Sequence, residues 1–251
     1  WMDDDPEDAQ QVATGGSISE EELLSRPQRT SISANNARAT MHLRLGAAIA
    51  LLLLSATVLL STLANEFHDF SFPTFALHPL LMSLAFGVFA PLAAIFWRLA
   101  AAASPGTSRS TMKAIHVLLM VAATLTGMVG VADMWRVHDI GAAASLKKGI
   151  AVHFQSLHSW IGIVVMMMFA WQAVSGLLAF GTRILAPYKR KAALPPHRFV
   201  GSMAVHGGLV ALVTGLLSMA GRGNNETRSD LGYKFAALLI MALSVCLAGV
   251  L

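Results

Sequence analysis

Six stretches of the chain are each long and apolar enough to cross a lipid bilayer, which leaves little freedom in the fold. They run near residues 43–64, 75–101, 112–134, 157–181, 198–220 and 233–251. A spanning helix needs about 20 predominantly apolar residues, and in lipid only helices and closed barrels satisfy their backbone polar groups. With only 13% charged residues, against about 25% in soluble domains, we expect an all-α, integral membrane six-helix bundle at residues 41–251.

Residues 1–40 are polar and poor in apolar side chains, so they predict a disordered cytosolic tail. The tail, the second and fourth loops and the adjoining helix ends carry most of the lysines and arginines: Arg26, Arg29, Arg38, Arg44, Arg98, Arg109, Lys113, Arg183, Lys189, Arg190, Lys191 and Arg198. The positive-inside rule then places both termini of a multi-pass protein in the cytosol. The sequon Asn225-Glu226-Thr227 falls in the fifth loop, which this topology places outside the cytosol.

Four histidines recur near the N-terminal ends of four successive apolar segments: His78, His116, His158 and His197. Their spacing is nearly even and corresponds to one membrane crossing plus a loop. A lone histidine in a membrane helix is usually a packing or interfacial residue. Ionisable residues within a membrane are costly, however, and commonly mark functional sites. Their recurrence, once in each helix, favours metal ligation.

Alternating helix direction determines which histidines can meet. The second and fourth helices run in the same direction, so His78 and His158 lie at one depth, near the outer face. The third and fifth run the opposite way, so His116 and His197 share the inner depth. Two imidazoles from facing helices suit the two axial positions of a haem. Each iron would lie about one turn inside a hydrocarbon core of roughly 30 Å, leaving roughly 20 Å between the irons.

We expect different roles for three other histidines. His206 lies on roughly the opposite helix face from His197, beside Gly207 and Gly208, and we interpret it as a packing or hydrogen-bonding residue. His138 and His153 are expected in the third loop, on the outer side, where they could line a substrate site above the outer haem or serve only as surface residues.

The segments around these histidines resemble the cytochrome b561 family. The resemblance rests on LHPLLM at 77–82, Lys113-x-x-His116, SLHSWIG at 156–162 and Pro195-Pro196-His197 with Gly201, and it covers roughly residues 43–245. It implies that four central helices bind two haems b, with His78, His158, His116 and His197 as axial ligands. It also implies cytosolic ascorbate as electron donor.

The same resemblance suggests substrate residues on both sides of the membrane. Lys113 matches a lysine that helps to bind ascorbate, and Lys189, Arg190 and Lys191 occupy the region of a second basic contact. Ascorbate is an anion, so a cluster of cations would raise its local concentration. On the outer side, Trp135-Arg136-Val137-His138 resembles a stretch near the acceptor site. The segment from His138 to His158 is longer than the family leads us to expect, so His153 could replace or assist His138.

We therefore predict a transmembrane oxidoreductase of the ferric reductase type, in which ascorbate reduces the inner haem and the outer haem reduces a ferric chelate. One alternative is reduction of monodehydroascorbate, regenerating ascorbate inside a vesicle. A different class is a haem-free, proton-linked helical transporter. Expected partners are ascorbate, the acceptor, membrane lipid and, in a homodimer, a second copy of the chain; no nucleic acid is expected. The expected location is the plasma membrane or an endosomal or vesicular membrane.

Overall fold

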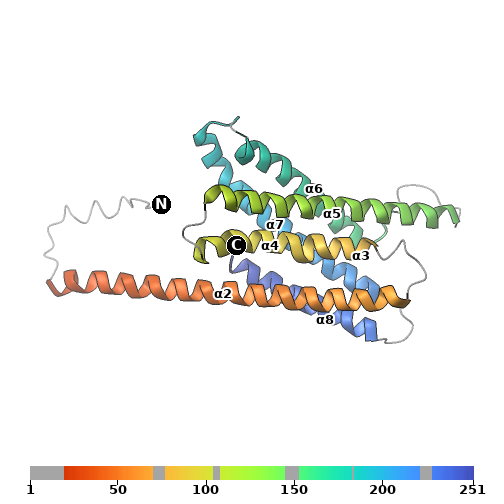
Figure 1. Cartoon of the computed structure of the whole chain (residues 1–251), viewed down its shortest axis with the longest axis horizontal. Helices are drawn as coiled ribbons and strands as arrows, with labels where there is room; N and C mark the ends of the chain where they lie inside the picture. Colours follow the sequence, from red (N-terminus) through yellow and green to blue (C-terminus); the bar gives the residue numbers. More distant parts are fainter. Residues whose placement is uncertain (1–19, 70–76, 104–107, 145–152, 183, 221–227) are drawn as a thin grey trace. The chain divides into compact units, whose positions relative to one another are not determined.

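The computed structural model describes residues 20–69, 77–103, 108–144, 153–182, 184–220 and 228–251. The chain divides into two units, Trp1–Leu43 and Arg44–Leu251. Helix α2 carries residues of both units. The described elements, all helical, are α2 (Glu20–Asp69), α3 (Leu77–Met82), η2 (Ser83–Phe89), α4 (Ala90–Ala103), α5 (Arg109–Ala144), α6 (Leu157–Gly176), η4 (Leu177–Gly181), α7 (Pro187–Ala220) and α8 (Arg228–Ala248) (Figure 1).

The predicted all-α membrane fold is confirmed. Within the described ranges, six helical segments are long and apolar enough to span a membrane: Arg38–Ala64, Leu77–Trp97, Ser110–Gly141, Leu157–Gly181, Pro187–Ala220 and Asp230–Ala248. Many large apolar side chains on these segments are exposed, among them Leu118, Trp171 and Leu238. Such a surface is unfavourable in water but suits contact with lipid.

The second span combines three elements, α3, η2 and α4, and η2 is a π-helical stretch. Pro91 lies two residues after Phe89, the last residue of this stretch. Proline has no amide hydrogen and its ring collides with the carbonyl four residues earlier, so a locally wider helix accommodates it. A second π-helical stretch, η4, ends the α6 span.

Four spans form the central packing of the unit Arg44–Leu251. Helix α5 packs against α3, η2 and α4 on one side and against α6 on the other, while α7 packs against α6, η2 and α8. Small residues allow the closest approaches: a Cβ atom on Gly208 would lie 2.9 Å from the ring of Phe86, and one on Gly127 would lie 3.2 Å from the same ring. Helix interfaces in membranes are enriched in such small residues.

Two expected boundaries were wrong. The fifth span was predicted to begin near residue 198, but α7 begins at Pro187 and includes Pro195 and Pro196. Pro187 suits the first position of the helix, because the amide hydrogen that proline lacks would be unpaired there in any case. The tail predicted to be disordered over residues 1–40 is helical from Glu20 onward, while residues 1–19, like the sequon, lie outside the described residues.

His206 joins α7 to α8. Its Nδ1 lies 2.8 Å from the carbonyl oxygen of Ser202, and its Nε2 lies 3.2 Å from that of Ser244 on α8. The prediction that His206 is a hydrogen-bonding residue is therefore confirmed.

Candidate functional site

His78 on α3 and His158 on α6 lie face to edge within the bundle. Their ring centroids are 6.1 Å apart and their planes are nearly perpendicular, at 86°. Both side chains are half-buried. The two residues are far apart in the sequence, and they meet because α3 and α6 run in the same direction through the bundle. The two rings are therefore at one depth, as alternating helix direction implies.

Each of these rings is oriented by a backbone carbonyl on a neighbouring helix. Nδ1–H of His78 donates to the carbonyl oxygen of Gly130 on α5 at 2.8 Å, and Nδ1–H of His158 donates to that of Ala211 on α7 at 2.9 Å. Because a carbonyl oxygen only accepts hydrogen bonds, the proton of each neutral ring is fixed on Nδ1. Nε2 is then left as the metal-binding nitrogen, which is the usual arrangement of a ligating histidine.

The distance between the two rings fits a shared iron. A metal–imidazole bond is about 2 Å and each ring nitrogen lies roughly 1 Å from its centroid, so two axial imidazoles hold their centroids roughly 6 Å apart. Both histidines line a cavity of about 330 Å³ with Phe86, Met166 and Leu212. This volume lies within the roughly 300–1,000 Å³ of ligand pockets. The residues present therefore fit a bis-histidine haem.

Gly215 on α7 leaves space for the His158 ring, because it has no side chain. A Cβ atom on Gly215 would lie only 2.9 Å from its Cε1 atom. The glycine on α7 is therefore needed for the ring to occupy its present position.

The second pair, His116 on α5 and His197 on α7, has a similar setting. Nδ1–H of His116 donates to the carbonyl oxygen of Ala93 on α4 at 3.2 Å, and Trp97 lies edge-on to its ring, with centroids 6.0 Å apart. The His197 ring lies 5.1 Å from the Phe180 ring of η4, centroid to centroid. A Cβ on Gly176 would lie 3.0 Å from its Cε1 atom. His116 and His197 are close enough to interact electrostatically.

The separation in depth between the two pairs follows from the residues to which the histidines are hydrogen-bonded. Gly130 marks the depth of His78 on α5, and Ala93 marks the depth of His116 on α4. At about 1.5 Å per residue, the path from His116 to Gly130 along α5 is roughly 20 Å long. The path from His78 to Ala93 through η2 has a similar length. Among the described residues no three or more His, Cys, Asp or Glu side chains are placed to hold a metal ion, and a haem requires only two.

The basic residues predicted to bind ascorbate lie on α5 and α7, the two helices that carry the second pair. Lys113 is exposed, and its Nζ donates to the carbonyl oxygen of Phe180 at 3.4 Å, which places it beside the ring that contacts His197. Lys189, Arg190 and Lys191 lie in the first turns of α7. Arg190 precedes His197 by two helical turns and therefore lies on the same helix face; it is half-buried, whereas Lys189 and Lys191 are exposed.

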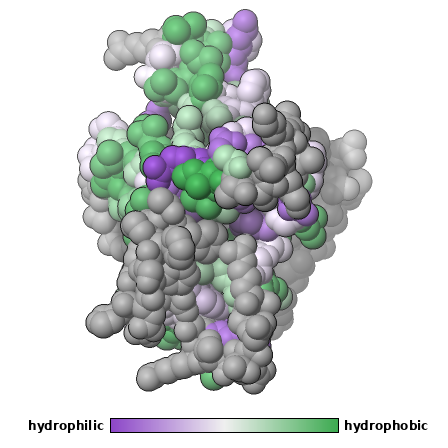
Figure 2. Space-filling model, turned by 90° about the vertical axis from the view of Figure 1, so that its right-hand side faces the viewer, coloured by the Kyte–Doolittle hydropathy of each residue, from purple (hydrophilic) through white to green (hydrophobic). Residues whose placement is uncertain are grey.

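Two of the three predicted acceptor residues line the cavity of the first pair. His138, which was expected in the loop, lies on α5, and both it and His153 border the cavity. The His153 ring stacks on Trp135 at 3.8 Å between centroids. Nε2 of His153 lies 3.2 Å from Oδ1 of Asp139. Arg136 does not line this cavity; its guanidinium lies 3.7 Å from Oδ1 of Asp133. Figure 2 views the molecule from the end at which α3 begins. Hydrophilic residues lie near the middle of this face, among hydrophobic ones.

Comparison with known families decides the relationship. The model of the family described as "Eukaryotic cytochrome b561" matches residues 77–221, more than half of the chain. The chain belongs to the cytochrome b561 family. Members of this family bind haem b, which agrees with the donor set of both histidine pairs.

Several relatives of this cytochrome b561 have curated names. The chain is 32% identical over 141 residues to "Probable transmembrane ascorbate ferrireductase 4" of Arabidopsis thaliana, covering 56% of this chain and 54% of the relative. It is 31% identical over 127 residues to "Probable ascorbate-specific transmembrane electron transporter 2" of Oryza sativa subsp. japonica, covering 51% and 49%. It is 28% identical over 139 residues to "Plasma membrane ascorbate-dependent reductase CYBRD1" of Rattus norvegicus, covering 54% and 44%. The chain spans about half the length of these curated relatives.

Sequence reasoning missed some residues of this b561 site. Asp133 is a buried carboxylate near His78, and its position inside an apolar run was a usable signal, because ionisable residues within a membrane are rare. No such signal marks the two glycines that make room for histidine rings, Gly176 and Gly215, or the aromatic contact Phe180. Their roles depend on which helices pack together.

Proposed function

We propose that this cytochrome b561 binds two haems b, one between His78 and His158 and one between His116 and His197, and carries electrons across the membrane from ascorbate to a ferric chelate. When bound, each haem supplies a one-electron couple of its iron. The observation that carries the proposal is the presence of two histidine pairs roughly 20 Å apart in depth, with three of the four rings anchored through Nδ1 to a backbone carbonyl.

The residues around His197 support ascorbate as donor. Lys113 and Arg190 offer two fixed cations, one from α5 and one from α7, and Lys189 and Lys191 add positive charge nearby. Cations raise the local concentration of a monoanion, and all three relatives named above carry ascorbate in their names. We assign this end to the cytosol, following the positive-inside rule.

The residues around His158 support an acceptor site at the opposite end. His138, His153 and Trp135 border the cavity that His78 and His158 share. Imidazole is a ligand that suits iron, and stacking on Trp135 together with the Asp139 contact fixes the orientation of the His153 ring. Arg136, which is exposed beside this cluster, adds a cation that attracts an anionic chelate.

Monodehydroascorbate is the alternative acceptor, because one relative is named as an electron transporter rather than a ferrireductase. It is also an anion that Arg136 would attract, so the cations alone do not separate the two.

A liposome assay tests the proposal. The purified chain is reconstituted into vesicles loaded with ascorbate, and a ferric chelate with a ferrous indicator is added outside. We expect indicator colour to depend on both the protein and the enclosed ascorbate. Replacing the ferric chelate by monodehydroascorbate compares the two acceptors. A haem-containing protein that passes electrons to neither acceptor would refute the proposal, and a colourless protein would favour the proton-linked transporter.

A further inference from the structure

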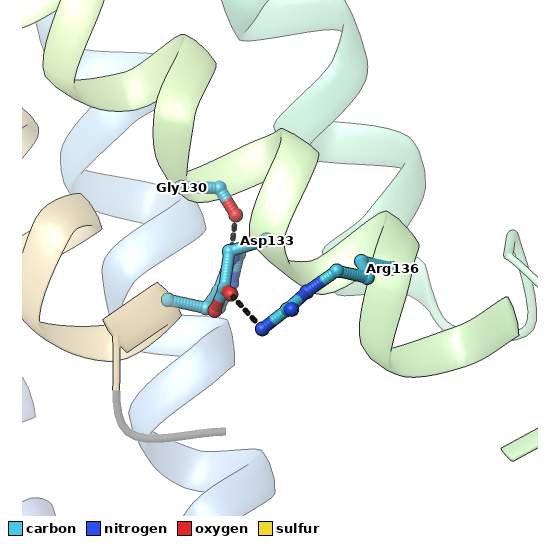
Figure 3. Close-up of polar contacts among 4 residues, drawn as sticks. Gly130, Asp133 and Arg136 are labelled. Carbon is cyan, nitrogen blue, oxygen red and sulfur yellow. Dashed lines mark hydrogen bonds and ion pairs between the residues drawn. The ribbon is translucent and has the colours of Figure 1, made fainter. Parts of the chain in front are cut away.

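Asp133 is a buried acid that the proposed electron path does not use. It lies on α5 within the span Ser110–Gly141, and only 8% of its side chain is exposed. Oδ1 lies 3.7 Å from the guanidinium of Arg136, and Oδ2 is buried without a hydrogen-bond partner among the described residues. Figure 3 shows the Asp133 carboxylate facing the Arg136 guanidinium from the preceding turn of α5, with Gly130 one turn before Asp133.

The charge of Asp133 is only partly compensated. The ion pair that it forms with Arg136, within the part of the chain that the structure describes, is longer than a hydrogen bond. The Arg136 side chain is 60% exposed, so water screens the cation. Burying a carboxylate costs free energy unless it is paired and hydrogen-bonded. A buried acid that keeps one oxygen unpaired therefore leaves a local negative potential in a medium of low dielectric constant.

This negative potential acts on His78, one of the two histidines of the first pair. Asp133 lies one helical turn after Gly130, whose carbonyl oxygen accepts the Nδ1–H of His78. The carboxylate is close enough to the His78 ring to act on it electrostatically. Groups that surround a ligating histidine in this way tune the metal that it holds.

We propose that Asp133 sets the redox potential of the haem held by His78 and His158, a role that rests on the ligation proposed above. Oxidation of the iron adds one positive charge, so a nearby buried anion stabilises the ferric form and lowers the midpoint potential. A lower potential at this end makes the haem a stronger reductant toward the acceptor. Arg136 acts in the opposite sense, as the partial counter-charge of Asp133.

Potentiometric titration of the purified full chain in lipid nanodiscs, followed by haem absorbance, tests this role. The component of the first pair is identified as the one lost in His158→Ala. In Asp133→Asn we expect its midpoint to shift upward, with the other component unchanged, and in Asp133→Glu to stay close to that of the wild type. Arg136→Gln should shift it downward. Asp230→Asn is the matched control, because this carboxylate on α8 is also largely buried, at 12% exposed, and does not line the cavity of the first pair; we expect no shift.

The outcomes separate this inference from the proposed ligation. Two bound haems with an unchanged midpoint in Asp133→Asn would overturn the role of Asp133 and leave the ligation standing. Shifts in the same direction for Asp133→Asn and Arg136→Gln would also overturn it, because a packing defect rather than charge would then be the cause. A wild-type chain with fewer than two haems would overturn the ligation itself, and this inference with it.

Discussion

Replacing Gly215 by alanine should weaken the haem site of His78 and His158 specifically. The added Cβ would lie 2.9 Å from Cε1 and 3.3 Å from Nδ1 of His158, whereas ordinary contacts begin near 3.4 Å. The ring would therefore have to move by a few tenths of an ångström, which also disturbs the 2.9 Å hydrogen bond from its Nδ1–H to Ala211. Overpacking of this kind costs about 1–3 kcal/mol.

Because helix propensity favours alanine over glycine by about 1 kcal/mol, α7 itself should remain folded. The strain should therefore appear mainly in haem affinity, as a loss of about tenfold, since about 1.4 kcal/mol corresponds to a factor of ten.

The assay is a haem titration of the apoprotein, with the two sites resolved by their reduced spectra. Gly176→Ala should weaken the other site instead, because its Cβ would lie 3.0 Å from Cε1 of His197. Gly46→Ala is the matched control, because nothing lies within 4 Å of the added Cβ. Wild-type affinity at both sites in Gly215→Ala would refute the argument that the glycine makes room for a ligating ring.

Two further predictions concern other contacts. Lys113→Gln should raise the KM for ascorbate about fivefold and leave haem content unchanged, because an exposed cation contributes about 1 kcal/mol to binding an anion. Steady-state kinetics measure this KM, with Lys234→Gln on α8 as the control. An unchanged KM would exclude Lys113 from the donor site. His206→Leu should lower the free energy of unfolding by about 1–3 kcal/mol, because the ring N–H no longer donates to a carbonyl oxygen, that of Ser202 or that of Ser244. Denaturation in detergent checks this, and a loss of haem would contradict its assignment as a packing residue.

The membrane fold could be predicted because hydropathy alone identifies spans of this length. The alternation of helix direction then brings His78 and His158 to one depth, and the structure places their rings 6.1 Å apart; their ligation stays a prediction. Local pattern cannot supply the packing partners. Gly130, Ala93 and Ala211 act through backbone carbonyls, which any residue type provides, so no sequence signal identifies them.

The errors at the helix ends have a physical cause. Helix ends follow from cooperative propagation rather than from hydropathy, and a helix that is already formed extends without a new nucleation step. The polar segment from Glu20 to Thr40 can therefore continue the apolar part of α2. In α7, Pro195 and Pro196 are exposed, so water can reach the carbonyl groups that the missing proline amides leave unpaired.

The haem content of His158→Ala shows whether the four histidines hold two separate haems. We expect the purified variant to retain one of two haems, and ascorbate still to reduce this haem, because His116 and His197 are untouched. Retention of both haems, or loss of both from a folded protein, would contradict the assignment of four histidines to two separate centres.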